Sequence, residues 1–142
     1  MLELIQDYWL YFLVGQYPNG PLGGLSLTIL LSAAALVLAM PLGLVLGVAR
    51  VSPYRAVRWP VAVLVQVVRA VPLLLVVFWA YFFLPAVTGV KTGQATTMLM
   101  TLVLFDAVYL AEIVKAGIAS LPKGQLEGAR SLGLSYGQAL RL

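Results

Sequence analysis

Residues 25–49 read LSLTILLSAAALVLAMPLGLVLGVA, an uncharged run of 25 residues that ends at Arg50. As a helix this run would be about 37 Å long at 1.5 Å per residue, more than the roughly 30 Å hydrocarbon core of a bilayer. Pro41 lies inside the run and is expected to kink the helix. The run therefore predicts a tilted transmembrane helix.

The same run carries small residues at intervals of four, which fall on one face of a helix. They are Ala35, Ala39, Gly43 and Gly47. Helices in lipid associate through close packing rather than through a hydrophobic driving force, and small residues permit the close approach. We therefore predict that a second helix packs on this face.

The composition places the chain in a membrane. Of 142 residues, 62% are hydrophobic and 10% are charged, whereas soluble domains carry about 25% charged residues. The chain has neither histidine nor cysteine, which excludes disulfides, imidazole catalysis and metal sites built on those ligands. It also has no G-x-x-x-x-G-K-[ST] phosphate loop. We expect no enzymatic activity, no metal and no cofactor in this chain.

Two further apolar stretches, residues 59–84 and 94–118, predict two more spans. The fold class is therefore an all-α polytopic membrane protein with three transmembrane helices. The connection 50–58 contains three arginines, whereas the connection 85–93 contains only Lys91. Four more basic residues accompany the end of the third span: Lys115, Lys123, Arg130 and Arg141. Because basic residues accumulate on the cytoplasmic side, we expect the N-terminus outside and the C-terminus inside. The net charge of +4 is then explained by the basic residues on the cytoplasmic side, and no nucleic acid is expected as a partner.

The chain divides into three parts on this interpretation. Residues 1–24 form an N-terminal interfacial or periplasmic segment, residues 25–118 the transmembrane domain, and residues 119–142 a cytoplasmic segment. Within the first part, residues 8–14 are aromatic and too short to cross a bilayer. They are expected either to lie at the level of the headgroups or to pack as an arm on neighbouring helices.

Three charges interrupt the apolar spans: Arg69, Asp106 and Glu112. A charge at the bilayer centre costs about 2.5–3.5 kcal/mol on insertion scales, so such residues usually face a bundle interior or water. One interpretation makes all three the polar lining of a substrate path. The other pairs Arg69 with one of the carboxylates, and Glu112 with Lys115 three residues away, as structural ion pairs.

The segment 119–142 predicts a helix, a tight turn and a second helix. Pro122 suits the first turn of a helix, and Gly133 suits the left-handed residue that ends one. Ser135 and Gln138 have the spacing of a capping box. Such an amphipathic helix pair beneath a membrane indicates a docking partner. The G-x-S-x-G match at residues 133–137 is not a nucleophile elbow, because the chain has no histidine to accept the serine proton.

The stretch KGQLEGARSLGLS at residues 123–135 resembles the E-A-A-x-x-x-G loop of ABC-importer permeases. On that resemblance the acid is Glu127, the two small positions are Gly128 and Ala129, and the glycine is Gly133. Gly128 departs from the usual alanine. In that family the loop is the coupling helix, which fits into a groove of the ATPase subunit.

Two other stretches strengthen the resemblance. RAVPLL at residues 69–74 resembles the R-G-T-P-L signature of polar-amino-acid permeases, with positions 70 and 71 substituted. YLAEIVKAGI at residues 109–118 resembles Y-x-x-E-I-x-R-x-G-I, with Lys115 in place of arginine. FWAYF at residues 78–82 looks closest to members that import glutamate and aspartate. The resemblance implies a type I importer permease of MetI-like fold that is truncated at its C-terminus, because such permeases have about five helices.

The resemblance also implies a function. It indicates a permease subunit that moves a polar amino acid across the bacterial inner membrane by alternating access. The implied partners are an ATPase subunit that binds ATP, a second permease copy or paralogue, and an extracytoplasmic substrate-binding protein. Two alternatives remain open: an ion-coupled secondary carrier in which Asp106 and Glu112 relay protons, and a membrane scaffold that transports nothing.

Overall fold

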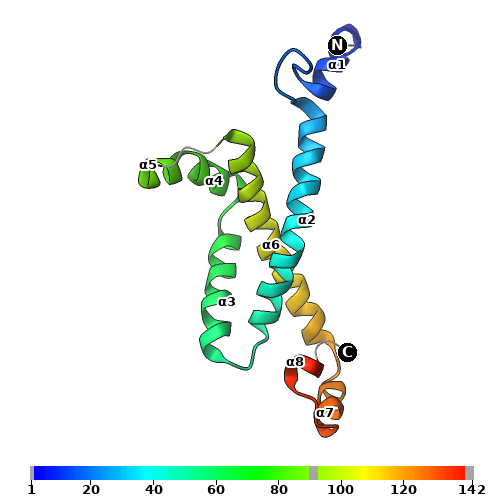
Figure 1. The fold of residues 1–142 in the computed structure, drawn as a ribbon, viewed down its shortest axis with the longest axis vertical. Helices are drawn as coiled ribbons and strands as arrows, with labels where there is room; N and C mark the ends of the chain where they lie inside the picture. The colour runs from blue at the N-terminus through cyan, green and yellow to red at the C-terminus, as the bar shows by residue number, and fades with distance from the viewer. Residues whose placement is uncertain (1, 90–92, 140–142) are drawn as a thin grey trace.

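The computed structural model describes residues 2–89 and 93–139, and this part of the chain is helical without named strands (Figure 1). Two helices, α2 and α6, are each long and apolar enough to cross a membrane. The helices in chain order are α1 (Leu2–Val14), α2 (Gly24–Arg50), α3 (Arg55–Ala70), α4 (Leu73–Phe78), the π-helical turn η1 (Trp79–Phe83), α5 (Leu84–Thr88), α6 (Gln94–Ser120), α7 (Lys123–Ser131) and α8 (Tyr136–Ala139).

The main packing contact of the fold joins α2 to α6, which cross each other in Figure 1. All four residues of the small-residue stripe on α2 are buried there: Ala35, Ala39, Gly43 and Gly47. A Cβ atom at Gly43 would lie 2.6 Å from the Cβ of Leu110, and one at Gly47 would lie 2.5 Å from the Cβ of Val114. The two helices therefore run in the same direction with their backbones too close for a larger side chain.

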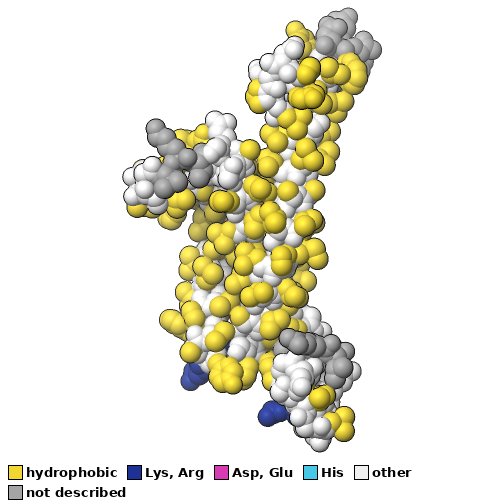
Figure 2. All heavy atoms as spheres, viewed as in Figure 1, with side chains coloured by type: hydrophobic (Ala, Val, Ile, Leu, Met, Phe, Trp, Pro, Cys, Tyr) yellow, Lys and Arg dark blue, Asp and Glu magenta, His cyan; other side chains and the backbone are white. Residues whose placement is uncertain are grey.

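Helix α3 packs against both α6 and α2. Val65 of α3 is fully buried against Val108 and Ala111 of α6, and this cluster is the centre of a small core. Large apolar side chains remain exposed over most of the molecule, and Figure 2 shows them on both long helices. Such a surface suits lipid or further helices rather than water. The protein is therefore a membrane protein.

The second predicted span, residues 59–84, is not a continuous helix. The chain breaks at Val71 and Pro72, and α3 meets the α4–α5 segment at an angle of 101°. Proline has no N–H to donate, and it disfavours helical geometry at the residue before it. Val71 accordingly takes extended angles, with φ −104° and ψ 130°. After the bend, α4 lies beside the start of α6, and α5 projects to the left, away from α2 (Figure 1). The predicted loop 85–93 starts as helix α5, and Lys91 lies outside the described residues.

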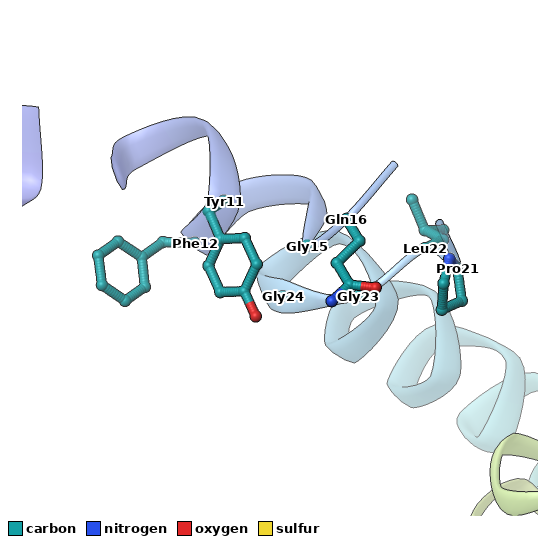
Figure 3. A pocket seen from close by; sticks show the side chains of 8 residues that line it. All are labelled: Tyr11, Phe12, Gly15, Gln16, Pro21, Leu22, Gly23 and Gly24. Atoms are coloured by element: carbon teal, nitrogen blue, oxygen red, sulfur yellow. The ribbon is translucent and has the colours of Figure 1, made fainter. Parts of the chain in front are cut away.

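The N-terminal helix α1 folds back onto the start of α2. The N–H of Gly23 donates to the carbonyl of Val14 at 3.1 Å, and the Ser26 hydroxyl donates to the carbonyl of Leu13 at 2.6 Å. An open pocket of about 380 Å³ lies beside this turn, between Tyr11 and Phe12 and residues 21–24 (Figure 3). Helix α1 therefore packs on α2, as the arm interpretation predicts, and its aromatic side chains stay exposed; a position at the level of the headgroups stays a prediction.

Candidate functional site

A cluster of four charged residues joins the three longest helices around one carboxylate. Glu112 of α6 accepts hydrogen bonds from Arg50 of α2 and from Arg69 of α3, the second at 2.9 Å. Lys115 lies one turn along α6, with its Nζ 3.3 Å from Oε1 of Glu112. The structure thus contains both ion pairs of the second sequence interpretation, and it adds Arg50 to them.

In the sequence, Arg50 stands out only as one of the three arginines of the connection 50–58. Its side chain is 8% exposed, far less than the 35% of Arg69. The small-residue stripe of α2 carries a signal for the contact between Arg50 and Glu112. Gly47 meets Ala111 and Val114, so the residue three positions after Gly47 must come close to Glu112. This inference requires knowing which residues of α2 face which residues of α6, and the sequence alone does not show that.

Arg50 is the buried member of the charged cluster. Removing one member of a buried ion pair costs about 3–5 kcal/mol, because the other charge is left without a partner. The Nε of Arg50 is buried and finds no hydrogen-bond acceptor among the described residues, so Glu112 is the counter-charge on which Arg50 depends. The Arg69 guanidinium also lies 5.3 Å from the ring centroid of Tyr109, within cation–π range. Glu112 therefore holds α2, α3 and α6 together.

Asp106 stands apart from this cluster. It lies near the middle of α6 and is half-buried. Within residues 2–89 and 93–139, no hydrogen bond or ion pair is formed by its carboxylate. Of the three intramembrane charges predicted as one lining, Arg69 and Glu112 form an ion pair, whereas Asp106 forms a hydrogen bond or ion pair with neither.

The C-terminal helix pair, α7 and α8, has the local structure that the sequence predicts. Helix α7 follows Pro122 and ends at Ser131, and Gly133, two residues further on, has φ +82°. The N–H of Gly133 donates to the carbonyl of Arg130 at 3.0 Å, and the N–H of Leu134 donates to that of Ala129 at 3.2 Å. This is the Schellman pattern of a helix C-terminus.

The start of α8 is capped as predicted. The backbone N–H of Ser135 donates to the Gln138 side chain at 2.9 Å, and the N–H of Gln138 donates to the Ser135 hydroxyl at 3.4 Å. Both donors would otherwise be unsatisfied at a helix N-terminus. The turn between α7 and α8 is therefore held by hydrogen bonds on both sides.

The residues matched to the coupling loop lie on the surface of the C-terminal helix pair. Glu127, Gly128 and Gly133 are exposed, and Ala129 is half-buried. A Cβ atom at Gly128 or Gly133 would meet nothing within 4 Å among the described residues. The pair extends beyond the end of α6 (Figure 1), and the Lys and Arg side chains visible in Figure 2 lie at this end of the molecule. The arrangement leaves one face of α7 open to a partner.

Comparisons with known proteins agree with this arrangement. The family described as binding-protein-dependent transport system inner membrane component matches residues 39–142. The chain is 36% identical over 117 residues to the probable glutamine ABC transporter permease protein GlnP of Bacillus subtilis, covering 82% of this chain and 53% of that protein. It is 34% identical over 139 residues to the glutamate transport system permease protein GluD of Corynebacterium glutamicum, covering 96% of this chain and 51% of that protein.

A solved structure shows the same architecture. The crystal structure of an amino acid ABC transporter with histidines matches with a TM-score of 0.70 at 28% identity, covering 80% of this chain and 53% of that chain. The chain spans about half the length of the curated relatives it matches. The matched residues include the charged cluster and the C-terminal helix pair. This chain therefore belongs to the family of binding-protein-dependent transport system inner membrane components.

Proposed function

We propose that this chain is part of the permease subunit of an ATP-driven amino-acid importer in the bacterial inner membrane, and that α7 is its contact with the ATPase. The observation that carries the proposal is the C-terminal helix pair. It is capped, exposed and attached directly to the end of a membrane helix. Its surface presents Glu127 and Gly128, the positions that resemble the family's coupling loop. Relatives named for glutamine and glutamate transport support a polar amino acid as substrate, with glutamate or aspartate as our specific proposal.

The orientation follows from the basic residues. Arg50, Arg55 and Arg58 lie at the same end of the bundle as the C-terminal helix pair, and this end is proposed to face the cytoplasm. An extracytoplasmic substrate-binding protein would then approach the opposite end, where α1 and α5 lie. A second permease copy or paralogue would complete the path, and ATP would bind and react on the ATPase chain alone.

The proposed mechanism is alternating access driven from the cytoplasmic side. Closure of an ATPase dimer would displace α7, and the short connection at Leu121 and Pro122 would pass the displacement to α6. Asp106 is the proposed contact with the substrate, because its carboxylate has no partner among the described residues. Arg69 and Glu112 are proposed to border the same path, and their ion pair joins α3 to α6.

The alternative of a proton-relaying carrier fits this geometry less well. A relay carboxylate must gain and lose protons in every cycle, whereas Glu112 would have to give up ion pairs to three cations each time. A carrier also gives α7 no partner. The importer accounts for both features.

The test is affinity capture of the membrane-embedded chain, with partners identified by mass spectrometry. Wild type should recover an ATPase that carries a phosphate loop, and Glu127→Lys should lose it at equal membrane abundance. Arg55→Glu is the matched control, since it reverses another exposed charge at the same end of the bundle and should keep the ATPase. Wild-type capture without any ATPase would refute the proposal.

A further inference from the structure

One hydrogen bond ties the C-terminal helix pair to the membrane helices. The hydroxyl of Tyr136 donates to the backbone carbonyl of Val51 at 2.9 Å, across 85 residues of sequence. Among the described residues, we find no second hydrogen bond between residues 122–139 and residues 24–120. We propose that Tyr136 is a positioning residue. Through its hydrogen bond, the end of α2 at Arg50 moves together with α7. This inference rests on the proposed function.

Both ends of this contact are held in place. Tyr136 is the first residue of α8 and follows Ser135, whose capping hydrogen bonds with Gln138 fix the start of that helix. Val51 is the C-cap of α2, and its N–H donates to the carbonyl of Val48 at 3.2 Å. Helix C-termini leave carbonyls without intrahelical partners. The half-buried Tyr136 side chain supplies a donor to a carbonyl at that end.

The contact matters because of what it adds to the covalent link. The C-terminal helix pair joins α6 through Leu121 and Pro122, where both residues have extended ψ angles of 137° and 131°. A body attached at one short connection can swivel about it. A second attachment at Val51 removes that freedom, so that displacing α7 moves α6 and α2 together.

The second attachment leads directly into the charged cluster. Val51 follows Arg50, and Arg50 binds Glu112, which also binds Arg69 of α3. A continuous set of contacts therefore runs from α8 through the end of α2 to all three long helices. Loss of the Tyr136 hydroxyl would leave α7 able to dock, with a looser transfer of its movement to α2.

The test uses the complete importer, with permease, ATPase and binding protein reconstituted in vesicles. Tyr136→Phe removes the hydroxyl alone. Tyr54→Phe is the matched control, since Tyr54 lies in the same α2–α3 turn and its hydroxyl has no hydrogen bond among the described residues. The measured quantities are ATPase recovery, ATP hydrolysis rate and substrate moved per ATP hydrolysed.

Tyr136→Phe should lower the substrate moved per ATP roughly 2- to 10-fold, the range of one hydrogen bond. ATPase recovery should stay at the wild-type level, and Tyr54→Phe should match wild type in every measurement. An unchanged ratio in Tyr136→Phe, or a loss of ATPase recovery that alone accounts for lost transport, would overturn the positioning role while the proposed function stands. Wild type that neither binds an ATPase nor transports would overturn both.

Discussion

Arg50, the last residue of α2, binds Glu112 of α6 across 62 residues of sequence, and its side chain is buried. The pair exists because α2 and α6 approach closely one turn earlier, where Gly47 lies against Ala111. A stripe of small residues thus sets the register that brings two charges together. This register bears on the stability of the protein, whereas Asp106 is proposed to act in transport.

Glu112→Gln should destabilise the protein more than Arg50→Met. The first change leaves the buried Arg50 without its counter-charge, at an expected cost of about 3 kcal/mol. The second change leaves Glu112 with Arg69 and Lys115 as partners. Thermal unfolding of the detergent-solubilised protein measures both, with wild type as reference. The reverse order would show that Glu112 is not the centre of the charged cluster.

Gly47→Ala should destabilise the packing of α2 on α6. The new Cβ atom would lie 2.5 Å from the Cβ of Val114 and 3.0 Å from the carbonyl oxygen of Ala111, and overpacking of this kind costs about 1–3 kcal/mol. Gly117→Ala is the matched control in α6, because its Cβ would meet nothing within 4 Å. The control should stabilise the helix by about 0.5–1 kcal/mol. Equal melting temperatures for the two variants would contradict the crossing geometry.

Asp106→Asn should impair transport without affecting the fold. The change preserves size and removes a charge that has no partner among the described residues, so the melting temperature should stay within experimental error. Uptake by the reconstituted importer should fall roughly tenfold, as expected when one charge-assisted hydrogen bond to a substrate is lost. Wild-type uptake in this variant would remove Asp106 from the substrate path.

The proposed orientation can be tested with single cysteines, since the natural chain has none. Asn19→Cys and Gln125→Cys replace exposed residues near opposite ends of the molecule. In cells whose cytoplasmic membrane is sealed, an impermeant maleimide should label position 19 and leave position 125 unlabelled until the membrane is opened. Labelling of position 125 alone in intact cells would mean that the topology is inverted.

The sequence predicted the long helices and the small turns for identifiable reasons. The apolar runs 25–49 and 94–118 give bounds within two residues of α2 and α6, because only a helix can satisfy backbone groups across that length in lipid. The left-handed Gly133 and the Ser135 capping box were predictable because both depend on neighbouring residues alone.

Two features escaped the sequence interpretation. The bend at Val71 and Pro72 lies inside the predicted span 59–84, which stays apolar on average despite Arg69, so hydropathy shows no break there and only the proline marks it. The partnership of Arg50 with Glu112 depends on which residues of α2 and α6 face each other. That is a property of packing in three dimensions, which charge counting along the chain does not reveal.

The bend at Val71 and Pro72 also has a consequence for the surrounding lipid. Helix α3 has 16 residues, about 24 Å at 1.5 Å per residue, whereas its neighbours α2 and α6 each have 27. Lipid in contact with α3 would meet a helix shorter than the roughly 30 Å hydrocarbon core. On that flank the bilayer would thin by several ångströms, or the exposed aromatic residues of the α4–α5 segment would make up the difference. The hydrophobic thickness of the protein is smaller beside α3 than beside α2 and α6. Its stability should therefore depend on the acyl-chain length of the lipids and be highest in thin membranes.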